Sequence, residues 1–315
     1  MKLNRLVVLA LLAIGLLAAV NILLERESLG ENGIPQSASQ SSSRDTIVVQ
    51  QPVPMTDQSL ETPDFYTAKI NPIDGASLVF IPSGEFMMGA EINQTIELCF
   101  SYRDECLAED FADEEPVHAV KLSSFWIFQH EVSNEMYRNC VDKGGCQIPA
   151  LTDFYNDQEY SDHPVVYINW YAAADYCDWA GGRLPTEAEW EKAARGADQR
   201  FYPWGEVGNC QLANYKGCVV KMTNPINGLK EGASPFGVLN LAGNVAEWTA
   251  DWYSTDYFSI TPYINPIGPM AGEFKVIRGG SWKNPVFGLR TTNRAANFPE
   301  IFSTGIGFRC VIDHQ

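Results

Sequence analysis

The chain has 315 residues, of which 45% are hydrophobic and 12% aromatic, enough apolar side chains for one large domain or two ordinary ones. Its 22 Lys and Arg residues stand against 39 Asp and Glu residues, a formal net charge of -17. This balance excludes nucleic acid as an expected partner, because a phosphate backbone would meet a surplus of carboxylates. Small molecules, cations and other proteins remain as expected partners.

The first residues predict export. Lys2 and Arg5 precede an apolar run over 6–24, which is long enough to cross a bilayer as a helix. The basic flank favours the cytoplasmic side and places the rest of the chain outside. We therefore predict an uncleaved signal anchor over 1–27, and a membrane-anchored, extracytoplasmic protein. The alternative is a cleaved signal peptide, which would make the protein secreted.

The cysteine content agrees with export. An even number of cysteines, eight, predicts disulfides in such a chain. Six of them form pairs that are close in sequence, and two remain for a long-range bond. The close pairs are Cys99 with Cys106, Cys140 with Cys146 and Cys210 with Cys218, and the remaining two are Cys177 and Cys310. A zinc site is the alternative, but no CxxC or paired-histidine spacing supports it.

The chain divides into a linker and a folded domain. Residues 28–65 are rich in serine and proline, which predicts a flexible linker. The folded domain is expected over 66–315. Because few stretches after residue 196 show a long regular period, we expect an α+β domain with much irregular, packed loop.

Short β-rich runs open the domain. The run 77–81 ends in a Pro-Ser-Gly turn and is followed by a second run over 86–89, which together predict a hairpin. Residues 90–116 predict an acidic surface excursion that carries two cysteines. Residues 117–127 alternate enough to predict one further strand.

Three helices follow. Ser133 is placed to cap a helix over 133–142. Apolar residues at positions i, i+3, i+4 and i+7 predict that one face of a helix over 169–180 is buried. Thr186 and Glu189 have the spacing of a capping box, which predicts the start of the third helix.

Eight short segments resemble the formylglycine-generating enzyme (sulfatase-modifying factor) family, and they follow the family's order over roughly 75–312. They are Ile81-Pro-Ser-Gly-Glu-Phe-Met-Met-Gly89, Glu131-Val-Ser-Asn134, His163-Pro-Val-Val-Tyr-Ile-Asn-Trp170, Gly182-Arg-Leu-Pro-Thr-Glu-Ala-Glu-Trp-Glu191, Tyr202-Pro-Trp-Gly205, Asn240-Leu-Ala-Gly-Asn-Val-Ala-Glu-Trp248, Arg278-Gly-Gly-Ser-Trp282 and Gly307-Phe-Arg-Cys310. The resemblance implies a C-type lectin-like variant of the α+β class that is braced by disulfides. It also implies that Cys177 bonds Cys310.

The resemblance further implies bound calcium. In the family, an N-x-x-G-N-x-x-E-W segment binds calcium through side chains and backbone carbonyls, ligands that suit this cation. The matching positions are Asn240, Gly243, Val245 and Glu247. A second site would begin at Asn214 and Tyr215, although no acidic partner is recognisable. The alternative is that Asn240 and Glu247 only form hydrogen bonds within their own loop.

The resemblance does not extend to the copper ligands of the family's aerobic enzymes. These are two cysteines, five residues apart, after the G-G-S-[YW] segment, and their positions here are Asn284 and Leu289. Neither supplies the thiolate that Cu(I) prefers, so copper is not expected. A groove beside these positions is nevertheless expected to bind ligands. Its candidate residues are Ser281, Arg290, Asn293 and Arg294.

Three functions fit this pattern. The favoured one is a binding or accessory module that holds a peptide, a protein or a small molecule in the groove near Ser281 and Arg290. The second is a family enzyme of different chemistry, acting on secreted peptide-like metabolites. The third is a formylglycine-generating oxidoreductase, converting a sulfatase cysteine, with displaced metal ligands.

Overall fold

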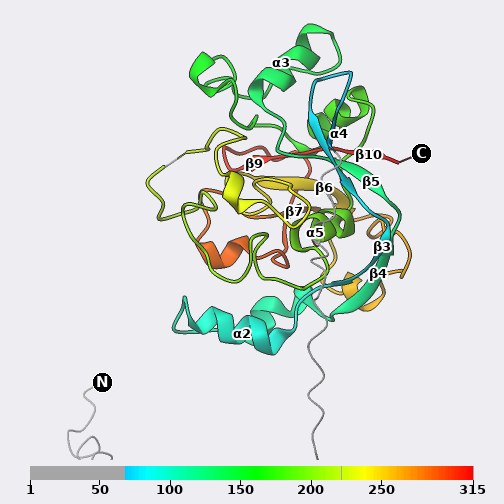
Figure 1. Cartoon of the computed structure of the whole chain (residues 1–315), viewed down its shortest axis with the longest axis vertical. Helices are drawn as coiled ribbons and strands as arrows, with labels where there is room; N and C mark the ends of the chain where they lie inside the picture. The colour runs from blue at the N-terminus through cyan, green and yellow to red at the C-terminus, as the bar shows by residue number, and fades with distance from the viewer. Residues whose placement is uncertain (1–67, 221, 315) are drawn as a thin grey trace, which may run out of the picture. The chain divides into compact units, whose positions relative to one another are not determined.

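A computed structural model of the protein describes residues 68–220 and 222–314. Figure 1 shows these residues as a mixed domain of short strands and short helices. The predicted signal anchor over 1–27 and linker over 28–65 lie outside the described residues. Within the described part, no helix is long and apolar enough to cross a membrane.

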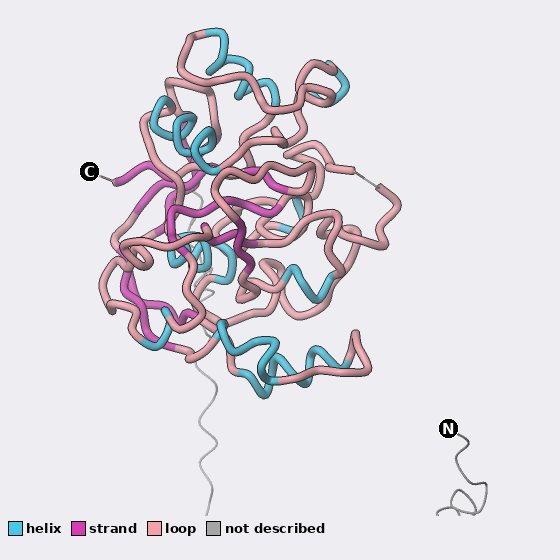
Figure 2. The backbone as a smooth tube through the Cα atoms, turned by 180° about the vertical axis from the view of Figure 1, so that it is seen from behind, coloured by secondary structure: helices cyan, strands magenta, loops and turns pink. Residues whose placement is uncertain are grey.

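The regular elements are short and widely separated by loops, as Figure 2 shows. The strands are β1 (Ala68–Ile70), β2 (Ser77–Ile81), β3 (Gly84–Met88), β4 (His118–Leu122), β5 (Phe125–Phe128), β6 (Ala246–Trp252), β7 (Lys275–Arg278), β8 (Ala295–Asn297), β9 (Ile306–Gly307) and β10 (Val311–Asp313). The α-helices are α2 (Ile92–Phe100), α3 (Asn134–Asp142), α4 (Trp170–Trp179) and α5 (Glu187–Arg195). The 3-10 turns are η1 (Ala108–Glu114), η2 (Gln158–Tyr160), η3 (Lys230–Gly232), η4 (Tyr257–Ser259) and η5 (Val286–Leu289).

The strands form three small sheets, and this arrangement corrects the predicted hairpin. One sheet has the order β1-β2-β5-β10, a second pairs β3 with β4, and the third has the order β8-β7-β6-β9. Thus β2 and β3 are consecutive but belong to different sheets. Gly84, with φ at 147°, begins β3 in a backbone conformation that side chains disfavour. This turn redirects the chain towards β4 instead of back along β2.

The strand predicted over 117–127 is also divided between two sheets. It breaks at Ser123, where β4 ends its pairing with β3 and β5 begins its pairing with β2. The Ser123 N–H donates to the side chain of Asn265 at 2.8 Å. A distant loop therefore takes the hydrogen bond that would otherwise extend the strand.

The sequence predicts the acidic segment over 90–116 as a surface excursion, but the structure buries part of it. It contains α2 and η1, and its Cys99, Phe111 and Glu114 are buried. Phe111 packs edge-on against Phe287, with the ring centroids 5.6 Å apart. This segment therefore contributes to the interior.

The three predicted helices are present at the predicted positions. The Ser133 hydroxyl accepts from the Met136 N–H and caps α3. Both capping-box hydrogen bonds form at the start of α5, between Thr186 and Glu189. Every residue of α5 is buried, including its charged ones. Figure 1 shows α5 in the middle of the described domain, beside β6 and β7.

Four disulfides join the expected partners, and no described cysteine is free. They are Cys99–Cys106, Cys140–Cys146, Cys177–Cys310 and Cys210–Cys218. The Cys177–Cys310 bond spans 133 residues and ties α4 to the residue before β10. Several disulfides in one domain are typical of extracytoplasmic proteins.

Replacing Cys177 and Cys310 together by alanine is expected to lower the free energy of unfolding by about 5 kcal/mol, because closure entropy grows with loop length. The matched control is Cys140 with Cys146, which is also buried but spans only 6 residues. For that pair the same relation gives about 2 kcal/mol. Guanidinium denaturation under non-reducing conditions measures both losses, and equal losses would contradict the prediction.

Candidate functional site

A cavity of about 450 Å³ lies between the loop over 215–220 and the loop that follows β7. Its lining residues are Tyr215, Lys216, Gly217, Cys218, Val220, Trp282 and Lys283. We call it the ligand cavity. It adjoins Ser281, where the sequence predicted a groove, and Ser281 itself is buried. The lysines and Trp282 were not among the predicted site residues. Only the position of Trp282 and Lys283 directly after Ser281 could have indicated them.

Asn284 joins the two walls of the ligand cavity. Its side-chain oxygen accepts from the backbone N–H and the hydroxyl of Ser281, at 2.9 and 2.8 Å. Its backbone carbonyl accepts from the Lys216 N–H at 2.9 Å. The residue at the first copper-ligand position of the family therefore holds two loops together.

Leu289, at the second copper-ligand position, fills the interior behind the cavity. It is fully buried in a cluster with Tyr202, Ala213 and Ala242, against which Tyr215 packs. Since all eight cysteines are in disulfides, the described chain offers no thiolate near this cavity for a soft metal.

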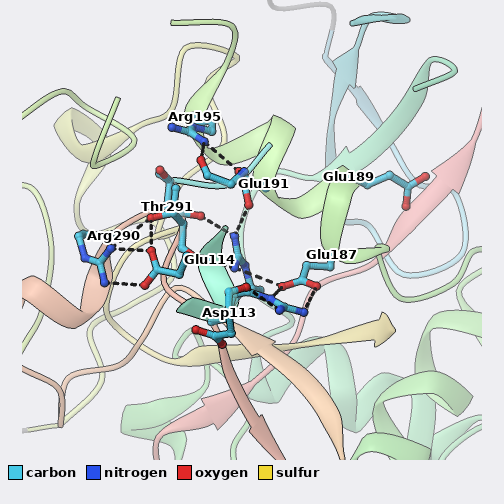
Figure 3. Close-up of polar contacts among 12 residues, drawn as sticks. Asp113, Glu114, Glu187, Glu189, Glu191, Arg195, Arg290 and Thr291 are labelled. Carbon is cyan, nitrogen blue, oxygen red and sulfur yellow. Dashed lines mark hydrogen bonds and ion pairs between the residues drawn. The ribbon is translucent and has the colours of Figure 1, made fainter. Parts of the chain in front are cut away.

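The predicted groove residues Arg290 and Arg294 are in fact buried ion-pair partners. Arg290 donates to both carboxylate oxygens of Glu114, at 2.6 and 2.7 Å. Arg294 donates to both oxygens of Glu187, at 2.8 and 2.9 Å. Figure 3 shows Arg290 directed at Glu114. The prediction that these arginines line the groove is wrong, because each carboxylate that they pair with is buried and requires a cation.

Further ion pairs extend this buried network. Arg278, from β7, contacts Glu187 and Glu191, and Arg195 also contacts Glu191. Although burial favours the neutral acid, Arg294 and Arg278 hold the pKa of Glu187 below its usual value. Asn293 lies at the edge of the network, where its side-chain oxygen is 3.5 Å from an Arg290 nitrogen.

The predicted calcium ligand Glu247 is also engaged. Its two oxygens accept from Arg309, at 2.6 and 2.7 Å, and one also accepts from the Trp190 indole at 2.8 Å. Asn240 donates its amide hydrogens to Glu131 and to the Ile226 carbonyl. The Glu247 carboxylate therefore does not fit a calcium ligand in this arrangement, because Arg309 already neutralises it.

The second predicted calcium segment lies against the first. The Asn214 carbonyl accepts from the Asn244 N–H at 2.8 Å, and a Cβ on Gly243 would lie only 2.4 Å from that oxygen. The side-chain oxygen of Asn214 is buried without a hydrogen-bond partner in the described chain, whereas Val245 is simply buried. Residues 68–220 and 222–314 contain no cluster of three or more His, Cys, Asp or Glu that could hold a metal. Calcium binding stays a prediction.

A further carboxylate, Asp251, is buried beside α5. Its side chain accepts from the Glu187 N–H at 2.8 Å. Burial, reinforced by repulsion from Glu187, raises the pKa of Asp251 to about 8. The folded protein therefore holds a proton on Asp251 at pH values where the unfolded chain has lost it.

Because of this proton, the contribution of Asp251 to stability is expected to be complete below pH about 4 and to be lost as the pH rises towards about 8. The variant Asp251→Asn keeps an oxygen for the Glu187 N–H but cannot ionise. Urea denaturation between pH 4 and 9 should show a smaller loss of stability with rising pH in this variant than in the wild type. The exposed control Asp198→Asn should leave the slope unchanged. Parallel wild-type and Asp251→Asn profiles would refute the assignment.

The buried pair between Arg290 and Glu114 gives a separate prediction. Glu114→Gln is expected to lower the free energy of unfolding by about 3–5 kcal/mol, because it leaves the Arg290 charge buried and unpaired. Asp198→Asn, which breaks the exposed pair with Arg200, should lower it by only about 0–1 kcal/mol. Chemical denaturation at pH 7 distinguishes the two variants. A loss for Glu114→Gln as small as that for Asp198→Asn would show that the Glu114 pair is not needed for stability.

Comparison with known proteins bears on the family and on the fold of the chain. The family described as "Sulfatase-modifying factor enzyme 1-like domain" matches residues 64–314. The chain is 34% identical over 255 residues to the serine/threonine-protein kinase pkn1 of Chlamydia caviae, which covers 74% of this chain and 37% of the kinase. The chain thus spans little more than a third of that relative.

Two further similarities cover nearly all of the other protein. The formylglycine-generating enzyme of Thermomonospora curvata is 31% identical over 296 residues, covering 75% of this chain and 93% of the enzyme. The structure of PvdO from Pseudomonas aeruginosa matches with a TM-score of 0.65 at 23% identity, covering 79% of this chain and 98% of PvdO. The predicted C-type lectin-like fold of the α+β class is confirmed, and the chain belongs to the sulfatase-modifying factor family.

Proposed function

We propose that this protein is a non-oxidase member of its family, a binding or accessory module that holds a peptide, a protein or a small molecule in the ligand cavity. The observation that carries the proposal is the role of Asn284. The residue that stands at a copper-ligand position fastens Ser281 to Lys216 through three hydrogen bonds. The ligand cavity lies beside this hydrogen-bonded loop, lined by Lys216, Trp282 and Lys283.

The second ligand position supports the same conclusion. Leu289 is buried among Tyr202, Ala213 and Ala242, and a thiolate there would be placed in an apolar cluster. Soft thiolates are the ligands that Cu(I) requires, and oxygen or hydrocarbon is a poor replacement. Both positions thus serve packing and loop geometry, while the volume beside them stays open.

We also propose that the domain works outside the cytoplasm on a membrane tether. Four disulfides are consistent with an oxidising compartment. The apolar run over 6–24 would anchor the chain, and the linker over 28–65 would hold the domain away from the bilayer. Such a tether suits a module that meets its ligand or partner at the cell surface or in the periplasm.

The alternative of formylglycine formation is tested directly. The oxidised protein is incubated with a Cys-x-Pro-x-Arg peptide, Cu(I) and oxygen, and the peptide mass is followed. We expect no aldehyde, because no described thiolate lies at the cavity to hold the metal. The formylglycine-generating enzyme of Thermomonospora curvata serves as the positive control. Aldehyde formation above the level of a no-protein blank would overturn the proposed function.

A further inference from the structure

We propose that the ligand cavity takes a small organic anion, a carboxylate attached to a flat apolar group. This inference rests on the proposed function, because it concerns the same cavity, and it names the chemical class of the ligand. Three features of the cavity carry it: the sign of its charge, the exposure of its lysines and the rigidity of its aromatic wall.

The charge of the lining is opposite to the charge of the protein. The cavity has two lysines, Lys216 and Lys283, and none of its lining residues is acidic. Four other cavities in the described part of the chain each include at least one carboxylate in their lining. Because the chain has 39 acidic against 22 basic residues, a lining whose charged residues are all basic differs from the overall charge of the protein. A concave site of one sign concentrates ligands of the opposite sign.

The two lysine side chains are exposed, and their charges are not neutralised by a carboxylate in the described chain. Within residues 68–220 and 222–314, neither Lys216 nor Lys283 forms an ion pair. By contrast, the ammonium groups of Lys192 and Lys275 donate to backbone carbonyls in the interior. In the described part of the chain, the Lys283 ammonium donates only to the Ser303 hydroxyl, at 3.5 Å, and lies 5.2 Å from the centre of the Trp282 ring.

The backbones that carry these lysines are fixed on the two walls. The Lys216 N–H donates to the Asn284 carbonyl at 2.9 Å, and the Lys283 N–H donates to the Ser281 hydroxyl at 3.3 Å. Both cations therefore belong to one hydrogen-bonded unit around Asn284. A carboxylate between them would meet two cations whose backbones are fixed before binding, while each ammonium still adjusts through its flexible stem.

The flat apolar part of the ligand would stack on the indole ring of Trp282. Its backbone N–H donates to the Asn244 carbonyl and its indole N–H donates to the Thr304 carbonyl, both at 3.0 Å. The ring is therefore held in place and offers a rigid surface for stacking. Tyr215 and the half-buried Cys218 supply further apolar contact. A cavity of about 450 Å³ matches the size of small-molecule sites.

Three naphthalene probes of similar size but different charge test the inference. They are 2-naphthoate, neutral 2-naphthamide and cationic 2-naphthylmethylamine, each titrated into the full protein by calorimetry and mapped by the NMR signal of the Trp282 indole N–H. We expect 2-naphthoate to bind at this cavity about tenfold more tightly than 2-naphthamide, because only the carboxylate is attracted by both lysine charges. We expect no binding of the amine.

Matched variants separate the contribution of the two lysine charges to binding from that of the Trp282 ring. Lys216→Gln combined with Lys283→Gln should reduce 2-naphthoate affinity about tenfold and leave 2-naphthamide unchanged, because only the anion uses the cations. The control variant is Lys230→Gln. Lys230 is an exposed lysine that lies beside Glu231 in another cavity, so this change should alter the affinity of neither probe. Raising the salt concentration should weaken only 2-naphthoate. Trp282→Phe should weaken both probes, and its unchanged Tm would show that the fold is retained.

The outcomes distinguish this inference from the proposed function. If the amine binds the cavity as tightly as 2-naphthoate, or if the lysine variants leave 2-naphthoate binding unchanged, the anion inference is wrong while a binding cavity remains. If no probe perturbs the Trp282 indole signal at millimolar concentration, the inference is likewise overturned. The proposed non-oxidase function is then judged separately, by the absence or presence of aldehyde in the peptide assay.

Discussion

The burial of α5 is the constraint on which the rest of the domain depends. Every residue of this helix is buried, so the carboxylates of Glu187 and Glu191 must be neutralised inside the protein. The cations come from distant parts of the chain, principally Arg278 and Arg294. A helix whose sequence resembles that of a charged surface helix is thereby buried, with β7 and the loop after η5 packed around it.

This network also positions the ligand cavity. The segment that forms one wall, Ser281 to Asn284, lies between two buried arginines, Arg278 before it and Arg290 after it. Arg278 is held by α5, and Arg290 is held by Glu114 of the acidic segment. Because both ends are fixed by paired charges, the intervening loop can present Trp282 and Lys283 in one geometry, as a binding site requires. The arginines that the sequence suggested as ligand contacts act instead through this loop.

Much of the local structure could be predicted from the sequence. Local hydrogen bonding decides the Ser133 cap and the capping box at Thr186. Apolar residues at helical spacing decide the buried face around Cys177. In each case the residues lie within a few positions of one another. The predicted hairpin failed for the opposite reason. Residues 77–81 and 86–89 have suitable patterns, but partners for β2 and β3 come from β5 and β4, and short-range patterns do not choose between sheets.

The sequence by itself determined the family, through eight ordered segments, and it determined that no cysteine stands at Asn284 or Leu289. That conclusion needs only residue identity. Whether a cysteine from elsewhere offers a thiolate there was decided by the structure, in which Cys218 lines the cavity but is bonded to Cys210. The tertiary structure alone decided which charges are buried and which are free. Glu114 and Arg290 are 176 residues apart. Lys216 and Lys283 lie on facing walls of one cavity, which are joined by the hydrogen bond from the Lys216 N–H to the Asn284 carbonyl. Charge pairing depends on distance in space and on exclusion from water, and neither quantity is encoded in local sequence pattern.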